Sequence, residues 1–62
     1  MNREQAAEKL TQGLQLKHHY FFEDEFIELR NDKILTEDGH DFTEQFWNLK
    51  QFEEGWEIYT AS

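Results

Sequence analysis

Apolar residues recur with two different periods along this chain of 62 residues. The first period is helical, and a set of aliphatic residues carries it: Ala6, Ala7, Leu10 and Leu14. Asn2 and Gln5 have the spacing of a capping box, in which each side chain bonds the backbone of the other residue. The pattern predicts a first helix over residues 3–12, with Gly13 as its stop.

Farther along the chain the period becomes two, which is typical of a strand with one buried face. The alternating residues are even-numbered: Leu14, Leu16, His18, Tyr20 and Phe22. The parity changes at Ile27 and again at Ile34, which predicts one tight turn at residues 24–25 and another at Asn31 and Asp32. Asn and Asp tolerate the positive φ of a two-residue hairpin turn.

Two-residue turns fix the pairing of these strands. Phe22 should then lie opposite Ile27, Tyr20 opposite Leu29, and Leu29 opposite Ile34. One face of the sheet would bury seven residues: Leu16, His18, Tyr20, Phe22, Ile27, Leu29 and Ile34.

A second helix is expected over residues 43–54, because Phe46, Leu49 and Phe52 form a stripe at helical spacing. Asp41 and Glu44 have capping-box spacing at its start, and Thr43 is a competing cap. Gly55 should end it, and the alternating WEIY of residues 56–59 predicts a closing strand.

The expected fold is therefore α+β, a single small domain over residues 1–62 with an antiparallel sheet, two helices and the order α-β-β-β-α-β. A third helix over residues 18–29 is the alternative, because Phe22, Phe26 and Leu29 also fit helical spacing.

Charge is the strongest compositional signal. The chain has 14 Asp and Glu residues against six Lys and Arg, and its net charge is −8. Residues 23–62 carry twelve of the acids and three of the bases. Such a field repels nucleic acid and anionic membranes and attracts basic protein surfaces, although acids also serve solubility alone.

Cysteine is absent, and the longest apolar run is residues 20–22, so neither a disulfide nor a membrane-spanning segment is predicted. These features are compatible with a cytoplasmic protein.

Residues for catalysis or metal binding are not grouped. His18 and His19 are adjacent and would point to opposite faces of a strand, while His40 has only nearby loop carboxylates. The only serine is Ser62, and the glycines are isolated, so no nucleophile with a base and no phosphate loop is present. We expect no enzymatic activity, no metal and no cofactor.

The remaining candidate site is a surface that binds a protein. If Phe22 and Ile27 face the core, alternation places Phe21, Phe26 and Leu35 on the opposite face among carboxylates. That face is an apolar patch with an acidic rim if both helices cover the other one. The predicted partner-binding residues are Phe21, Glu23, Asp24, Glu25, Phe26, Glu28, Leu35, Glu37, Asp38, Asp41 and Glu44.

Carboxylates two residues apart on a strand are separated by about 6.6 Å, similar to successive phosphates. Glu23 and Glu25 could thus imitate nucleic acid, which predicts an inhibitor or modulator that occupies a nucleic-acid-binding site on a basic partner. In size and composition the chain resembles the small acidic inhibitors that bacteriophages use against host nucleases, polymerases and CRISPR effectors. The alternative is an accessory domain that forms a homodimer through its aromatic sheet face.

Overall fold

The computed structural model describes residues 1–60 and shows helices α1 (Arg3–Thr11) and α2 (Thr43–Asn48), the latter followed by a short 3-10 helix, η1 (Lys50–Phe52). The four strands are β1 (Leu16–His18), β2 (Ile27–Arg30), β3 (Lys33–Thr36) and β4 (Trp56–Ile58). They form one antiparallel sheet in the order β3-β2-β1-β4. The predicted α+β fold and its α-β-β-β-α-β order are confirmed, and the alternative helix over residues 18–29 is wrong.

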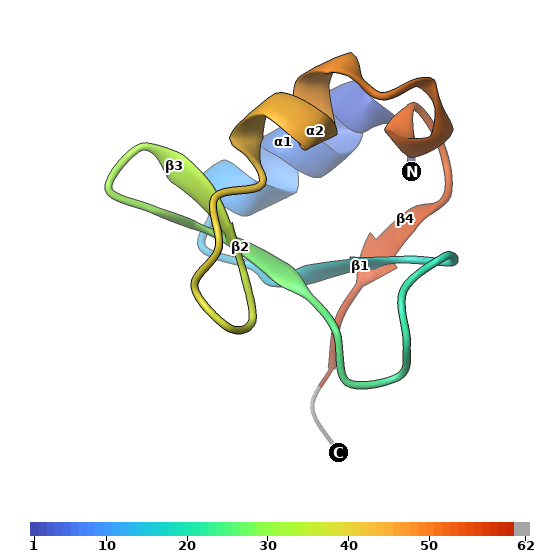
Figure 1. The fold of residues 1–62 in the computed structure, drawn as a ribbon. Helices are drawn as coiled ribbons and strands as arrows, with labels where there is room; N and C mark the ends of the chain where they lie inside the picture. The colour runs from blue at the N-terminus through green and yellow to red at the C-terminus, as the bar shows by residue number, and fades with distance from the viewer. Residues whose placement is uncertain (61–62) are drawn as a thin grey trace.

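Both helices lie on the same face of the sheet (Figure 1). Helix α1 contacts β1, β2 and β4, whereas α2 contacts β3. The buried residues lie between the two layers: Ala6, Leu10, Leu16, His18, Ile27, Ile34, Phe46, Phe52 and Trp56. Neither helix is long and apolar enough to cross a membrane.

Two local signals act as the sequence predicts. Asn2 accepts a hydrogen bond from the Gln5 amide at 2.8 Å while the Gln5 side chain accepts one from the Asn2 amide, so the capping box of α1 is complete. Asn31 and Asp32 have φ values of 50° and 64°, as a two-residue hairpin turn requires. The turn sets Leu29 opposite Ile34, the predicted register.

The outer edge of β3 is covered by the chain that follows it. The Thr36 amide donates to the His40 carbonyl at 2.8 Å, and the Phe42 amide donates to the Ile34 carbonyl at 2.7 Å. The Ile34 amide in turn donates to the Thr43 hydroxyl at 2.9 Å. Residues 40–43 therefore occupy the hydrogen-bonding groups that β3 directs away from β2.

The start of α2 differs from the prediction, because Phe42 is its N-cap and no side chain caps it. Asp41 forms an isolated bridge with Leu35, and its carboxylate accepts a hydrogen bond from the Thr43 amide at 3.0 Å. The predicted capping box of Asp41 and Glu44 is therefore wrong, since Asp41 is held against β3 before the helix begins.

Strand β1 is shorter than predicted, and its register with β2 differs. Leu16, not Phe22, pairs with Ile27, and residues 19–26 form a loop in place of a turn at residues 24–25. The chain turns directly after His18, where the Phe21 amide donates to the His18 carbonyl at 2.8 Å. Tyr20 and Phe22, which were predicted to be buried, remain 65% and 78% exposed.

The second helix is also shorter than the predicted span of residues 43–54, because the guanidinium of Arg3 binds its C-terminal carbonyl groups. Arg3 donates from Nε to the Phe46 carbonyl and from Nη2 to the Leu49 carbonyl, both at 2.6 Å. Leu49 has an extended backbone with ψ of 126°, which ends α2 before η1 begins. A cation at this position also complements the negative end of the helix dipole.

Replacing Arg3 with Ala should lower the free energy of unfolding by about 2 kcal/mol, because two carbonyl groups lose a charged donor. Arg30→Ala is a matched control, since Arg30 is exposed and pairs only with Glu28, and we expect a loss below about 0.5 kcal/mol. Urea denaturation followed by tryptophan fluorescence measures both. Equal effects of the two substitutions would show that the Arg3 contacts contribute nothing to stability.

Candidate protein-binding surface

The antiparallel sheet brings three connecting segments to one end of the molecule. β1 and β3 finish at this end, and β2 and β4 begin there, because each strand runs opposite to its neighbours. The segments at this end are residues 19–26, 37–42 and 53–55. Figure 1 shows the first two as loops on the same side of the sheet, coloured teal to green and yellow.

These three segments hold eight of the 14 acidic residues and no Lys or Arg. We call this group the acidic end: Glu23, Asp24, Glu25, Glu37, Asp38, Asp41, Glu53 and Glu54. All are exposed except the partly buried Glu25. No Lys or Arg forms an ion pair with any of them within residues 1–60. The structure thus groups six of the predicted partner-binding residues and adds Glu53 and Glu54.

An aromatic cluster fixes all three segments to the core. Phe21 comes from the first segment, Phe42 from the second, and Phe52 directly precedes the third. The rings of Phe21 and Phe42 are 5.9 Å apart, those of Phe42 and Phe52 5.1 Å, and those of Phe52 and Trp56 5.7 Å. The first two pairs are edge-to-face, a favoured arrangement of aromatic rings, and the third is tilted at 35°. One aromatic ring in or next to each segment therefore points inward and holds the acids of that segment at the surface.

His18 lies fully buried at the base of this cluster, between the rings of Phe52 and Trp56 at 4.9 Å each. Its Nδ1 faces the Tyr20 amide at 3.2 Å, and its Nε2 contacts the Glu54 carbonyl. An amide can only donate and a carbonyl can only accept, so the imidazole is neutral with its proton on Nε2. Burial lowers the pKa of His18 below its ordinary value of 6.5, although the Glu54 carbonyl opposes that change.

Gly55 makes room for the histidine rings. Its φ is 95°, and a Cβ placed there would overlap the rings of both His19 and His18. The absence of a side chain lets β4 begin beside β1, where the His19 amide donates to the Gly55 carbonyl at 3.2 Å.

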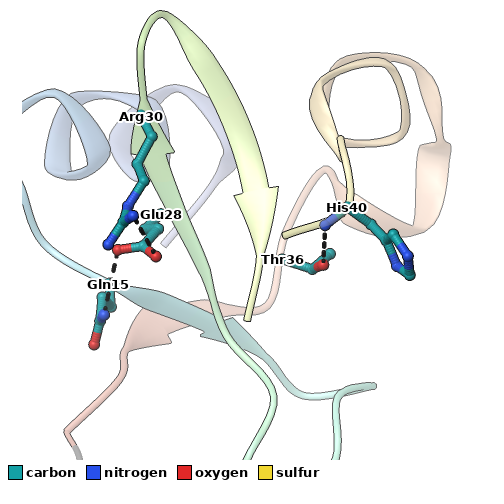
Figure 2. A network of polar contacts seen from close by, with 5 residues as sticks. All are labelled: Gln15, Glu28, Arg30, Thr36 and His40. Atoms are coloured by element: carbon teal, nitrogen blue, oxygen red, sulfur yellow. Dashed lines mark hydrogen bonds and ion pairs between the residues drawn. The ribbon is translucent and has the colours of Figure 1, made fainter. Parts of the chain in front are cut away.

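Hydrogen bonds order the second acidic segment. The His40 amide donates to the Thr36 hydroxyl at 3.1 Å (Figure 2). The same hydroxyl donates to the Asp38 carboxylate and lowers the pKa of Asp38 below 3.8. The Thr43 amide has the same effect on the pKa of Asp41. Both carboxylates thus stay ionised through the neutral range.

The sheet face away from the helices carries charged pairs in place of the predicted apolar patch. Lys17 lies 3.5 Å from Glu57 across β1 and β4. Figure 2 shows the Glu28 carboxylate between Gln15 and Arg30, each at 3.4 Å. Glu28 is therefore neutralised by this network and lies apart from the acidic end.

The apolar residues predicted for that face have different surroundings. Phe21 is turned into the core, because the loop after β1 has no strand alternation. Phe26 stacks on Tyr59 at 4.7 Å, while Leu35 is partly buried opposite Glu28. Glu44 lies in the first turn of α2, within the helix layer. The prediction of one apolar patch ringed by carboxylates is therefore wrong.

Tyr20 and Phe22 are the residues at this end that sequence alternation assigned to the core. The sequence carried one signal against this assignment. Three acids, the EDE of residues 23–25, follow Phe22 directly, and a strand that continued through Phe22 would have had to form its turn within them.

No group of three or more His, Asp or Glu side chains within residues 1–60 is arranged to hold a metal ion. Comparison with protein-family models, with curated proteins and with solved structures found no match. The surface must therefore be interpreted from its own geometry.

The free energy of unfolding should fall as the pH is lowered from about 8 to about 5. The unfolded chain takes up a proton near pH 6.5 at His18, whereas the folded protein does so only at lower pH, so stability present above 6.5 is lost below it. Asp38 and Asp41 act in a separate window, because their stabilising effect is lost only below pH 3.8.

Urea denaturation across this pH range, together with an NMR titration of the His18 imidazole, measures the effect. Constant stability between about pH 8 and about pH 5, with His18 titrating at or above 6.5, would contradict the assigned tautomer and its burial.

Proposed function

We propose that this protein is a small binding module that inhibits or modulates a basic protein by occupying a site that otherwise holds nucleic acid. The observation that carries the proposal is the acidic end, whose three segments hold eight carboxylates and no Lys or Arg. Charge of one sign gathered on one side gives a directional field, which speeds docking onto a surface of opposite sign.

Three of the six Lys and Arg residues are engaged by groups outside the acidic end. Arg3 binds carbonyl groups of α2, and Lys17 and Arg30 lie on the open sheet face beside Glu57 and Glu28. Some cations lie near the acidic end without forming ion pairs with it: Arg3 shares a shallow hollow with Glu53 and Glu54, and Lys17 shares one with Glu23. The acids of the three segments still outnumber these cations, and this uneven distribution supports a function in recognition, because solubility alone needs net charge but no gathering of it.

The density of negative charge at the acidic end supports a partner that binds nucleic acid. The predicted row of carboxylates at strand spacing is wrong, because residues 19–26 are a loop and the Glu25 carboxylate folds back onto the Phe22 amide at 2.7 Å. The acids instead form a patch drawn from three segments. Proteins that hold nucleic acid present dense Lys and Arg surfaces, and this patch is complementary to such a surface.

Self-association through the open sheet face has less support, because the face bears the pairs of Lys17 with Glu57 and of Arg30 with Glu28. A homodimer across this face would have to remove these charges from water. The desolvation penalty of a buried ion pair can exceed the attraction between its two charges.

Paired charge reversals test the proposal. Glu23→Lys with Asp24→Lys changes the acidic end and leaves Glu25, which orders the loop. Glu8→Lys with Asp32→Lys makes the same change of net charge at exposed residues outside the three segments. Immobilised wild-type protein should retain a nucleic-acid-binding protein from bacterial lysate, and a competing DNA oligonucleotide or added salt should release it.

The reversal at the acidic end should slow association with the retained protein by about tenfold or more, whereas the reversal at Glu8 and Asp32 should have a small effect. Surface plasmon resonance at several salt concentrations measures both rates, and circular dichroism verifies the fold of each variant. Equal effects of the two reversals, or retention that DNA does not reduce, would contradict the proposed site.

A further inference from the structure

Two large aromatic side chains stand in solvent at the acidic end. Phe22 is 78% exposed and Tyr20 is 65% exposed, the two highest exposures among the large hydrophobic side chains. The ring of Tyr20 lies against His19 at 4.3 Å, whereas Phe22 lies within no aromatic pair of the described residues. Aromatic side chains are enriched in protein interfaces, so two exposed rings beside exposed carboxylates are candidate contacts for another molecule.

The loop that carries these rings is held in place. The Tyr20 amide bonds His18 Nδ1 at 3.2 Å, and the intervening Phe21 packs its ring on Trp56 at 5.8 Å. On the far side of Phe22, the Glu25 amide donates to the Phe22 carbonyl at 3.0 Å. The two exposed rings therefore flank a partly buried one that packs against the core, and binding through them would order few further residues.

Carboxylates lie next to the exposed rings. The Phe22 amide donates to the Glu25 carboxylate at 2.7 Å, which fixes that group close to the Phe22 backbone. Glu23 and Asp24 follow in the same turn, and both are exposed. The loop thus presents planar apolar surfaces and anionic acceptors together.

We propose that the loop of residues 19–26 binds arginine side chains of the partner, with Tyr20 and Phe22 as stacking surfaces and Glu23, Asp24 and Glu25 as acceptors. A guanidinium is planar and weakly hydrated, so it can stack on a ring while its N–H groups bond a carboxylate. A lysine ammonium is a strongly hydrated point charge and gains less from the rings. The inference rests on the proposed function and specifies which cation the acidic end selects.

A second copy of this chain is a poor occupant of the loop. Arg3 is engaged by carbonyl groups of α2, and Arg30 pairs with Glu28 on the open sheet face. Each copy also carries a net charge of −8, which opposes association of the two acidic ends.

The test uses two synthetic peptides of about eight residues, alternating Gly with Arg in one and Gly with Lys in the other, so that they differ only in the type of cation. NMR titration of the isotope-labelled protein at low salt gives the affinity and the position of each peptide. The Arg peptide should bind at least about threefold tighter than the Lys peptide and shift the amides of residues 20–25.

The double substitution Tyr20→Leu with Phe22→Leu keeps apolar bulk and every carboxylate. It should remove the preference for Arg and leave the affinity for the Lys peptide unchanged. Trp47→Leu is the control, because Trp47 is an aromatic residue of α2, 47% exposed and outside the loop, and the preference should persist.

Equal affinity of the wild-type protein for both peptides would overturn the inference and leave the proposed function standing. A preference that survives in the Tyr20 and Phe22 variant, or shifts confined to other segments, would also overturn it. Absence of binding by either peptide at low salt would contradict the inference and the proposed function together. Dimerisation through the loop, seen by sedimentation, would identify a second copy as the occupant and overturn the inference.

Discussion

The acidic end depends on the aromatic cluster around His18. Carboxylates at this density repel one another, and segments that carry them stay together only if other groups bind them to the core. Phe21, Phe42 and Phe52 do this by packing with one another and with Trp56. Part of the interleaving of aromatic and acidic residues is thus explained, because Phe21, Phe42 and Phe52 hold the segments while the carboxylates face solvent.

Signals that act within a few residues were sufficient to predict much of the fold. The capping box of Asn2 and the turn at Asn31 and Asp32 require only their neighbours, and both occur as expected. The length of α2 could not be predicted in this way, because Arg3 binds the Phe46 carbonyl from 43 residues away in the sequence. A contact of that kind leaves no periodicity in the helix that it ends.

The acidic character of the candidate site could be predicted from the sequence, whereas the arrangement of its residues could not. Alternation from Leu16 to Phe22 favours a long strand, yet the strand stops where the His18 ring and its carbonyl receive the amides of Tyr20 and Phe21. A polar ring in the core must satisfy both of its nitrogen atoms, and that requirement outweighed burial of the two exposed rings. The same change of direction moved Phe21 inward and put the acids of residues 23–25 at the end of the sheet.

The closed edge of β3 restricts how this sheet can meet another chain. Residues 40–43 already occupy its outward amide and carbonyl groups, and on the opposite edge the Trp56 amide of β4 donates to the Met1 carbonyl at 3.2 Å. A strand from another molecule would therefore find few free backbone groups along either edge. Sheets protected in this way resist the edge-to-edge pairing that leads to fibrils. Recognition by addition of a peptide strand is disfavoured for the same reason, so a partner has to contact side chains.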